Sequence, residues 1–171
     1  KLLGWILFIF LFHLGQCVRY NPNRIDLEYE EKSFVIDANG TKVSLPGMTM
    51  RMNGPDVVYS PEKVAYLNFE EGQILKIQYS NKLYRQESER KIGEKTSIHA
   101  HGVINIPHNM DGVPYVSALP MEPGDQQYIE YQLQNTGTLW LHSHYSFQMG
   151  QGLIAPLIVH EKESEYSDFQ E

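Results

Sequence analysis

Four of the seven histidines lie in two His-x-His pairs, His99 with His101 and His142 with His144. On a β-strand, side chains at positions i and i+2 point to the same face, so each pair would present two imidazoles about 6–7 Å apart. That separation is too large for both imidazoles to bind one metal ion tightly, but it suits two neighbouring metal ions. If the two strands lie side by side, all four rings converge on one cavity, and imidazole is a ligand for copper, zinc, iron and nickel. We therefore predict a metal site with these four histidines as its ligands.

The remaining histidines, His13, His108 and His160, stand alone in the sequence. A lone histidine is more often structural or exposed than a ligand, and we expect no role in the metal site for these three.

The residues around the pairs restrict the metal chemistry. Cupin-type sites follow a His-x-His pair with a glutamate a few residues later, but the segment Gly102–Ile106 contains none. A blue-copper site needs two histidines and a cysteine thiolate, and Cys17, the only cysteine, lies outside the strand region. The chain thus offers ligands for a metal cluster without an electron-transfer copper of its own. Two alternatives stay open: a stand-alone copper-binding module, and a mononuclear zinc or iron site with Asp111 as the nearest carboxylate in sequence.

The elements that must position these histidines are short strands. From about Arg24 onward, apolar and polar residues alternate between Gly- and Pro-containing turns, a pattern typical of a β-sandwich or barrel. We predict one hairpin from Ser33–Asp37 and Thr41–Leu45, and a second from Lys63–Phe69 and Gln73–Ser80 across the turn at Glu70-Glu71-Gly72. The segment Gln127–Leu133 alternates in the same way.

Several segments together resemble the multicopper oxidases, the family of laccases, ascorbate oxidases and ferroxidases. They are Thr96–Gly102, Met110–Pro114, Pro120–Gly124 and Leu139–His144, the last followed by Gly152–Val159. Their order and spacing agree with the first cupredoxin domain of that family, and the likeness covers about Phe34 to Glu161. The resemblance implies an all-β, Greek-key β-sandwich of the cupredoxin type for residues 24–161, with copper as the cofactor.

The resemblance also implies a role for each histidine. His99 would ligate the type-2 copper of a trinuclear cluster, His101 and His142 one copper of the type-3 pair, and His144 the other. In the family, dioxygen is reduced to water at this cluster. The electrons come from a reducing substrate that is oxidised in one-electron steps at a blue copper in the last domain, which also supplies the other cluster histidines.

Other positions carry weaker implications. Gly102 and Gly152 are expected either to pack closely around the cluster or to serve as bulge or turn glycines. Asp111 would either orient a ligand histidine or simply precede Gly112 in a turn. Two positions depart from the family pattern. Ala100 replaces a frequent large aromatic residue, which could leave space near the cluster, and Leu119 replaces a frequent cysteine.

Composition and the two ends of the chain limit which partners are expected. The 171 residues carry a formal charge of −7, which argues against nucleic-acid binding because phosphate contacts need clustered Lys and Arg. Residues 1–17 include the apolar run Leu2–Leu14, which predicts a signal peptide or membrane anchor and a domain outside the cytosol, secreted or membrane-attached. The acidic residues 162–171 are expected to be a linker or the start of a second domain. We expect C-terminal cupredoxin domains, or an oligomer partner, to complete the cluster.

Overall fold

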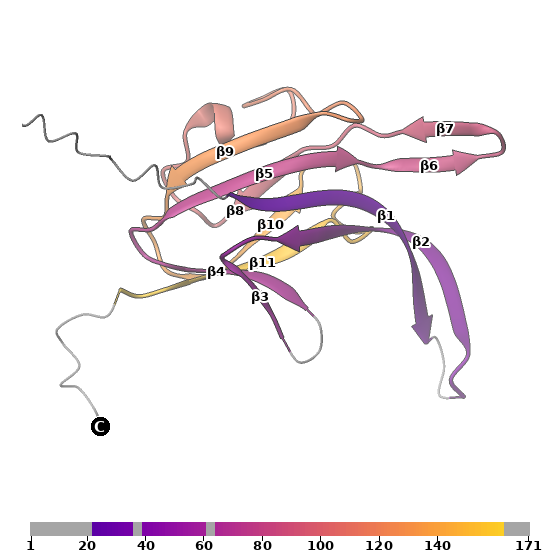
Figure 1. Ribbon diagram of the computed structural model, residues 1–171, viewed down its shortest axis with the longest axis horizontal. Coiled ribbons are helices and arrows are strands. Elements are labelled where there is room, and N and C mark those ends of the chain that lie inside the picture. The colour runs from indigo at the N-terminus through magenta and orange to yellow at the C-terminus, as the bar shows by residue number, and fades with distance from the viewer. Residues whose placement is uncertain (1–21, 36–38, 61–63, 163–171) are drawn as a thin grey trace, which may run out of the picture.

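The computed structural model describes residues 22–35, 39–60 and 64–162 (Figure 1). The predicted signal or anchor, His13, Cys17 and nearly all of the acidic C-terminal segment lie outside the described residues. Within the described part of the chain, no helix is both long and apolar enough to span a membrane.

Two sheets face each other, so the predicted β-sandwich is confirmed (Figure 1). The four-stranded sheet has the order β2-β1-β5-β9, formed by Lys42–Asn53, Asn23–Val35, Ile74–Lys82 and Gln126–Gln132. The five-stranded sheet has the order β3-β4-β11-β10-β8, formed by Val57–Tyr59, Ala65–Glu70, Ile154–His160, Gly137–Ser143 and Ile98–His101. A small hairpin, β6 (Tyr84–Glu87) with β7 (Arg90–Gly93), projects from one end, and a short 3-10 helix spans His108–Met110.

The first predicted hairpin is correct, but the second is wrong. β1 and β2 pair antiparallel from Val35↔Lys42 to Arg24↔Asn53, over a longer range than the alternation indicated. β4 and β5 do not pair, because the turn between them carries the chain from one sheet to the other. Its Glu71 amide donates to the His160 carbonyl of the five-stranded sheet, and the Gly72 amide donates to the Leu133 carbonyl, next to the end of β9 in the four-stranded sheet. A hairpin and such a crossing give the same alternation in sequence, since both strands turn one face to the core.

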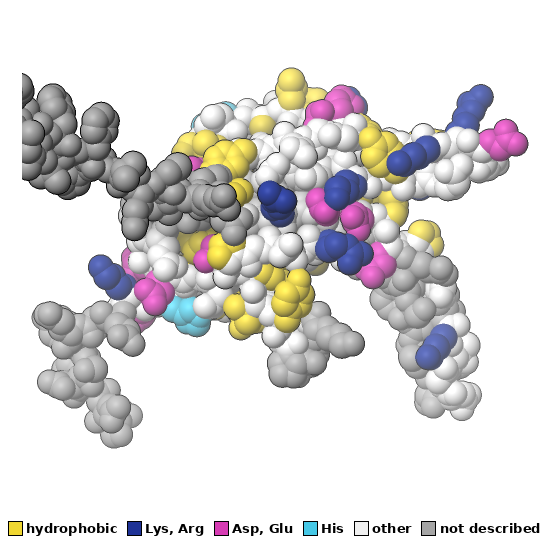
Figure 2. Space-filling view, in the orientation of Figure 1, with side chains coloured by type: hydrophobic (Ala, Val, Ile, Leu, Met, Phe, Trp, Pro, Cys, Tyr) yellow, Lys and Arg dark blue, Asp and Glu magenta, His cyan; other side chains and the backbone are white. Residues whose placement is uncertain are grey.

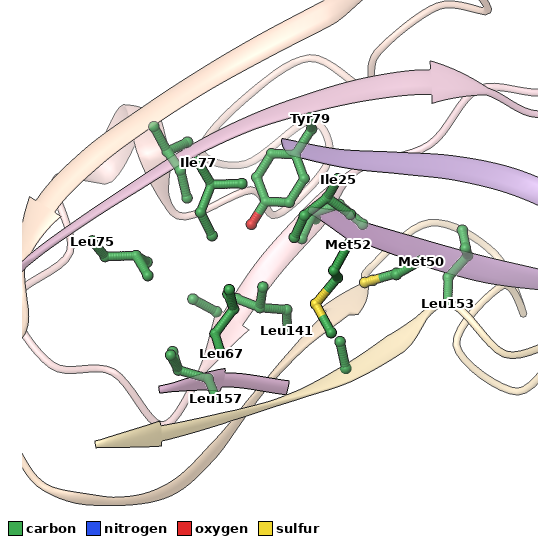
Figure 3. Packing of buried hydrophobic residues seen from close by; sticks show 14 of the residues in the cluster. Ile25, Met50, Met52, Leu67, Leu75, Ile77, Tyr79, Leu141, Leu153 and Leu157 are labelled. Carbon is green, nitrogen blue, oxygen red and sulfur yellow. The ribbon is translucent and has the colours of Figure 1, made fainter. Parts of the chain in front are cut away.

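The core is formed by the inner faces of both sheets (Figure 3). Ile77 and Tyr79 of β5 point toward Leu67 of β4 and Leu141 of β10, and each of these side chains is fully buried. Burying one such aliphatic side chain stabilises a fold by about 1.5–3 kcal/mol. The inward positions of β8 and β10 are therefore fixed strongly, and the residues between them must face outward.

Charged side chains of both signs lie side by side on the outer face of the four-stranded sheet (Figure 2). Arg51 pairs with Glu28 at 2.9 Å, and Lys82 pairs with Asp26. This face is a mixed, solvated surface, whereas the histidine pairs lie on the other sheet.

Candidate metal centre

The two histidine pairs are carried by neighbouring strands. β8 runs antiparallel beside β10, and the register places His99 opposite His142 and His101 opposite Trp140. The intervening residues Ala100 and Leu141 lie opposite each other and are both buried in the core. Because side chains alternate along a strand, the histidines are held on the outer face of the five-stranded sheet.

The structure brings all four rings together. The ring centroid of His99 lies 5.7 Å from that of His101, 5.5 Å from that of His142 and 5.7 Å from that of His144. Ligand nitrogens of His99, His101 and His142 lie within 4.8 Å of one another, while His144 is not part of this tighter group. His142 is buried, His99 is half-buried, and His101 and His144 are exposed.

Backbone carbonyls orient two of the rings. His99 Nδ1 lies 2.7 Å from the carbonyl oxygen of Asp111, and His142 Nδ1 lies 2.9 Å from the carbonyl oxygen of Ser143. A carbonyl only accepts hydrogen bonds, so each Nδ1 carries the proton and donates it. The Nε2 lone pair of both rings is then available to a metal ion, as in the outer contacts that fix the tautomer of metal-ligating histidines.

The third ring, His101, meets His142 through its other nitrogen. His101 Nδ1 lies 3.4 Å from His142 Nε2. Two imidazole nitrogens at about 2.0–2.1 Å from one tetrahedral metal ion are separated by about 3.3–3.4 Å. The observed separation therefore fits two nitrogens that share one ion, which would replace the proton held between them.

The environment of His142 favours its neutral imidazole. Burial is the main cause that lowers the pKa of His142. The hydrogen bond to the Ser143 carbonyl opposes it in part, and charge on the neighbouring rings of His99, His101 and His144 adds smaller lowering effects. Since a proton and a metal ion compete for the same lone pair, a lowered pKa keeps His142 ready to bind a cation near neutral pH.

Asp111 is both a turn residue and a partner of His99. Besides the carbonyl contact, its carboxylate Oδ1 lies 3.3 Å from the same Nδ1. The following Gly112 has φ +77°, and a Cβ there would lie 1.9 Å from the Ile98 carbonyl oxygen. The Asp111 carboxylate is not among the closely grouped donor atoms of the described residues, which counts against a mononuclear site that includes it.

The other sequence-based expectations have mixed outcomes. Ala100 leaves no space near the histidines, because its side chain points into the core and is only 4% exposed. Gly102 has φ +85°, and a Cβ there would meet Leu139 Cδ2 at 3.0 Å, so it is a turn glycine in close packing. Gly152 also has a positive φ, of 115°. Leu119 is largely exposed.

The two lone histidines within the described residues are exposed, as predicted. His108 lies on the short 3-10 helix, and His160 contacts Asn68 Oδ1 at 2.7 Å through its Nε2. Ile154, the first residue of β11, is the register partner of His142, whereas His160 is the last residue of β11. His160 is therefore far along the strand from the histidine pairs.

Sequence reasoning missed two residues around the histidines. The indole of Trp140 stacks on the His101 ring, and the side chain of Gln148 is buried behind the second pair. Trp140 precedes His142 by two positions, so strand alternation alone could have placed it on the histidine face. No periodic signal marks Gln148, which lies in a loop.

Comparison with known proteins agrees with this architecture. The sequence model of the multicopper oxidase family matches residues 63–164. The chain is 38% identical over 99 residues to copper resistance protein A of Pseudomonas syringae pv. tomato, which covers 58% of this chain and 15% of that protein. A multi-copper oxidase from Pseudomonas thermotolerans superposes with a TM-score of 0.58 at 29% identity, over 82% of this chain and 30% of that chain. A laccase from Botrytis aclada superposes with a TM-score of 0.57 at 32% identity, over 80% of this chain and 22% of that chain.

The chain spans less than a third of the length of each of these proteins. The residues that the family model matches contain both histidine pairs. Because the family model covers more than half of the sequence and the solved relatives share its β-sandwich, the chain belongs to the multicopper oxidase family, whose cofactor is copper.

Proposed function

We propose that this chain is the domain that supplies His99, His101, His142 and His144 to the trinuclear copper cluster of a multicopper oxidase. The observation that carries the proposal is the β8–β10 register, which sets His99 opposite His142 on one outer face. Three of the four imidazoles then have ligand nitrogens within 4.8 Å of one another.

The arrangement supports the division of ligands that the family resemblance implies. His101 and His142 would hold one type-3 copper, in keeping with the 3.4 Å between their nitrogens. His144, which lies outside the tighter group, would hold the other type-3 copper, and His99 would hold the type-2 copper. Copper in such a cluster supplies the four-electron reduction of dioxygen to water, coupled to one-electron oxidation of a reducing substrate. The part of this chain is to hold the four imidazoles close together on one face of the sheet.

A second domain, or another copy of the chain, is proposed to complete the cluster. Large apolar side chains are exposed on the two loops that follow the histidine strands. They include Leu119, which is 79% exposed, and Phe147, which is 86% exposed, with Tyr115, Val116 and Met149 beside them in sequence. Large exposed apolar side chains are typical of surfaces that contact a protein, a membrane or a ligand. These exposed side chains support a protein–protein interface around the four histidines, which are only part of the ligands of the cluster.

The domain limits and the location of the chain are also proposals. Residues 24–161 would be the copper-ligand domain, residues 1–17 a signal peptide or anchor, and residues 162–171 a linker. The apolar run Leu2–Leu14 supports a location outside the cytosol, secreted or membrane-attached.

One observation favours a second candidate, a copper-binding module without oxidase activity. The tight group of His99, His101 and His142 comes from a single chain, so one copper ion could bind without any partner.

Copper loading of the purified 171-residue chain tests the proposal. We expect copper to bind with an electron paramagnetic resonance spectrum of nitrogen ligation and no intense blue absorption. A His99→Ala/His142→Ala variant should lose this copper, whereas a His108→Ala/His160→Ala variant, equal in histidine count, should keep it. Equal copper uptake by the two double variants would contradict the assignment. Oxidase turnover by the lone chain would contradict the need for a partner, and a stable one-copper monomer without a docking partner would favour the binding module.

A further inference from the structure

A cluster of buried polar side chains lies directly behind the two histidine pairs. Thr96, Ser143 and Gln148 are each at most 3% exposed, although none of them is apolar. Burying polar groups costs free energy unless every group finds a hydrogen-bond partner, so such a cluster requires an explanation.

The side-chain amide of Gln148 is the centre of this cluster. Its Oε1 accepts hydrogen bonds from Thr96 Oγ1 at 2.7 Å and from Ser143 Oγ at 2.8 Å. Its Nε2 donates to the carbonyl oxygen of Lys95 at 2.8 Å. The Ser143 hydroxyl oxygen also accepts a hydrogen bond from the Tyr145 amide at 3.1 Å. The hydroxyl protons of Thr96 and Ser143 are both directed at Gln148 Oε1.

These bonds join three segments that determine where the histidines lie. Lys95 and Thr96 lead directly into β8, which carries His99 and His101. Ser143 is the last residue of β10 and stands between His142 and His144. Gln148 belongs to the loop that returns the chain to β11, where its carbonyl accepts from the Leu153 amide at 3.0 Å.

The loop itself is held in a conformation that needs external support. Ser146 has φ +52°, in the left-handed region that costs a non-glycine residue about 1–2 kcal/mol. His144 is attached to the β8 side by one long backbone bond, from its amide to the Ser97 carbonyl at 3.3 Å. The Gln148 amide makes two shorter bonds across the same junction, to Thr96 at 2.7 Å and to Lys95 at 2.8 Å, and a third bond ties it to Ser143 at the end of β10.

We propose that Gln148 is a positioning residue for the copper site: its side-chain amide fixes the start of β8 against the end of β10, and so sets the spacing between the two histidine pairs. Gln148 acts from the inner side of the sheet, through Thr96 and Ser143, and contributes no ligand. The inference rests on the proposed function, because it assumes that the four histidines bind copper.

Gln148→Leu in the full chain removes all three bonds and places an apolar side chain of similar size in the buried site. We expect copper affinity to fall by about 10- to 100-fold, as for outer contacts of metal ligands, with altered copper hyperfine splitting in the electron paramagnetic resonance spectrum. A Gln151→Leu variant, in the same loop but at an exposed position, should bind copper like the native chain.

A fall in copper affinity that comes from lower stability of the fold must be distinguished from one that comes from displaced histidines. Leu75→Ala removes a fully buried side chain from the other sheet and should lower the unfolding midpoint at least as much. Its folded fraction should keep native copper affinity and the native spectrum. If Gln148→Leu fails to fold, Thr96→Val serves instead. It removes one donor without changing shape and should weaken copper binding, while Thr96→Ser, which keeps the hydroxyl, should not.

Native affinity and spectrum in Gln148→Leu, or equal losses in Gln148→Leu and Leu75→Ala, would overturn the positioning role. Nitrogen-15 spectra of the imidazoles provide a copper-free measurement, in which Gln148→Leu should shift the His142 and His144 signals and leave those of His108 and His160 unchanged. If the native chain binds no copper, the proposed function fails. The imidazole shifts would still report whether Gln148 positions the rings.

Discussion

The indole ring of Trp140 lies flat against the imidazole of His101, with ring centroids 4.3 Å apart and planes inclined by 13°. The two residues are opposite each other in the β8–β10 register, so the stack follows from the strand pairing. It covers one face of the exposed histidine ring and restricts its rotation.

Replacement of Trp140 by leucine should loosen the His101 ring. Aromatic pairs are worth about 0.5–1.5 kcal/mol beyond buried area, so we expect copper affinity to fall by about 2- to 10-fold. Trp140→Phe, which keeps a flat ring, should stay near the native affinity. Titration with copper checks both variants, and in the native chain the fluorescence of Trp140 should be quenched as copper binds. Equal affinities in the native and leucine chains would contradict an orienting role for the stack.

Gly112→Ala should be strongly destabilising. The positive φ alone costs about 1–2 kcal/mol, and the added Cβ would meet the Ile98 carbonyl oxygen at 1.9 Å, so we expect a total loss above about 2 kcal/mol. Gly72→Ala is the matched control, because Gly72 has φ +86° with nothing within 4 Å of the added Cβ. Urea unfolding of the two variants isolates the cost of the collision. Since Ile98 begins β8 and Asp111 holds His99, copper affinity should fall only in the first variant.

Ala100→Phe tests which face of β8 this residue occupies. Its side chain lies in the core beside Leu141, so a phenylalanine should overpack the sandwich and cost about 1–3 kcal/mol in the free energy of unfolding. The outward position Thr138, on β10, should accept the same substitution with little change. A phenylalanine at residue 100 that leaves stability intact but blocks copper would show that the position faces the histidines after all.

Stability should fall at alkaline pH because of two core phenols. Burial raises the pKa of Tyr79, and Tyr131 nearby adds to this. Burial likewise raises the pKa of Tyr131, together with the Asp111 carboxylate. A raised pKa in the folded state favours the neutral phenol, so the contribution to stability is present below the ordinary value of about 10 and is lost as the pH rises above it.

Ultraviolet absorbance of phenolate, recorded beside circular dichroism, should show these two tyrosines ionising only as the chain unfolds. Neither hydroxyl has a hydrogen-bond partner within the described residues, so Tyr79→Phe should cost little at neutral pH and should extend stability to higher pH. Complete titration of all eleven tyrosines in a still-folded chain would contradict the prediction.

The sequence was sufficient to predict the sandwich and the convergence of the histidines, and the reason is periodicity. A His-x-His spacing on a strand whose alternate residues are apolar, such as Ile98 and Ala100, leaves the histidines only the opposite face. The same periodicity could not tell that β4 and β5 belong to different sheets, since alternation reports which face is buried and not which strand is the neighbour. It was also silent on Gln148, whose contacts depend on how a loop folds back over the core.

The pairing of the last strand has a consequence for how the site comes into existence. β10 joins the rest of its sheet through β11, and β11 in turn pairs parallel with β4. β4, which begins at Ala65, therefore gains this neighbour only after β11, which ends at His160, has been made. During translation, His99 and His101 are made roughly a few seconds before His142, and within the described residues β8 has no sheet neighbour other than β10. The two histidine pairs therefore come together only after β10 has been made and has paired with β8.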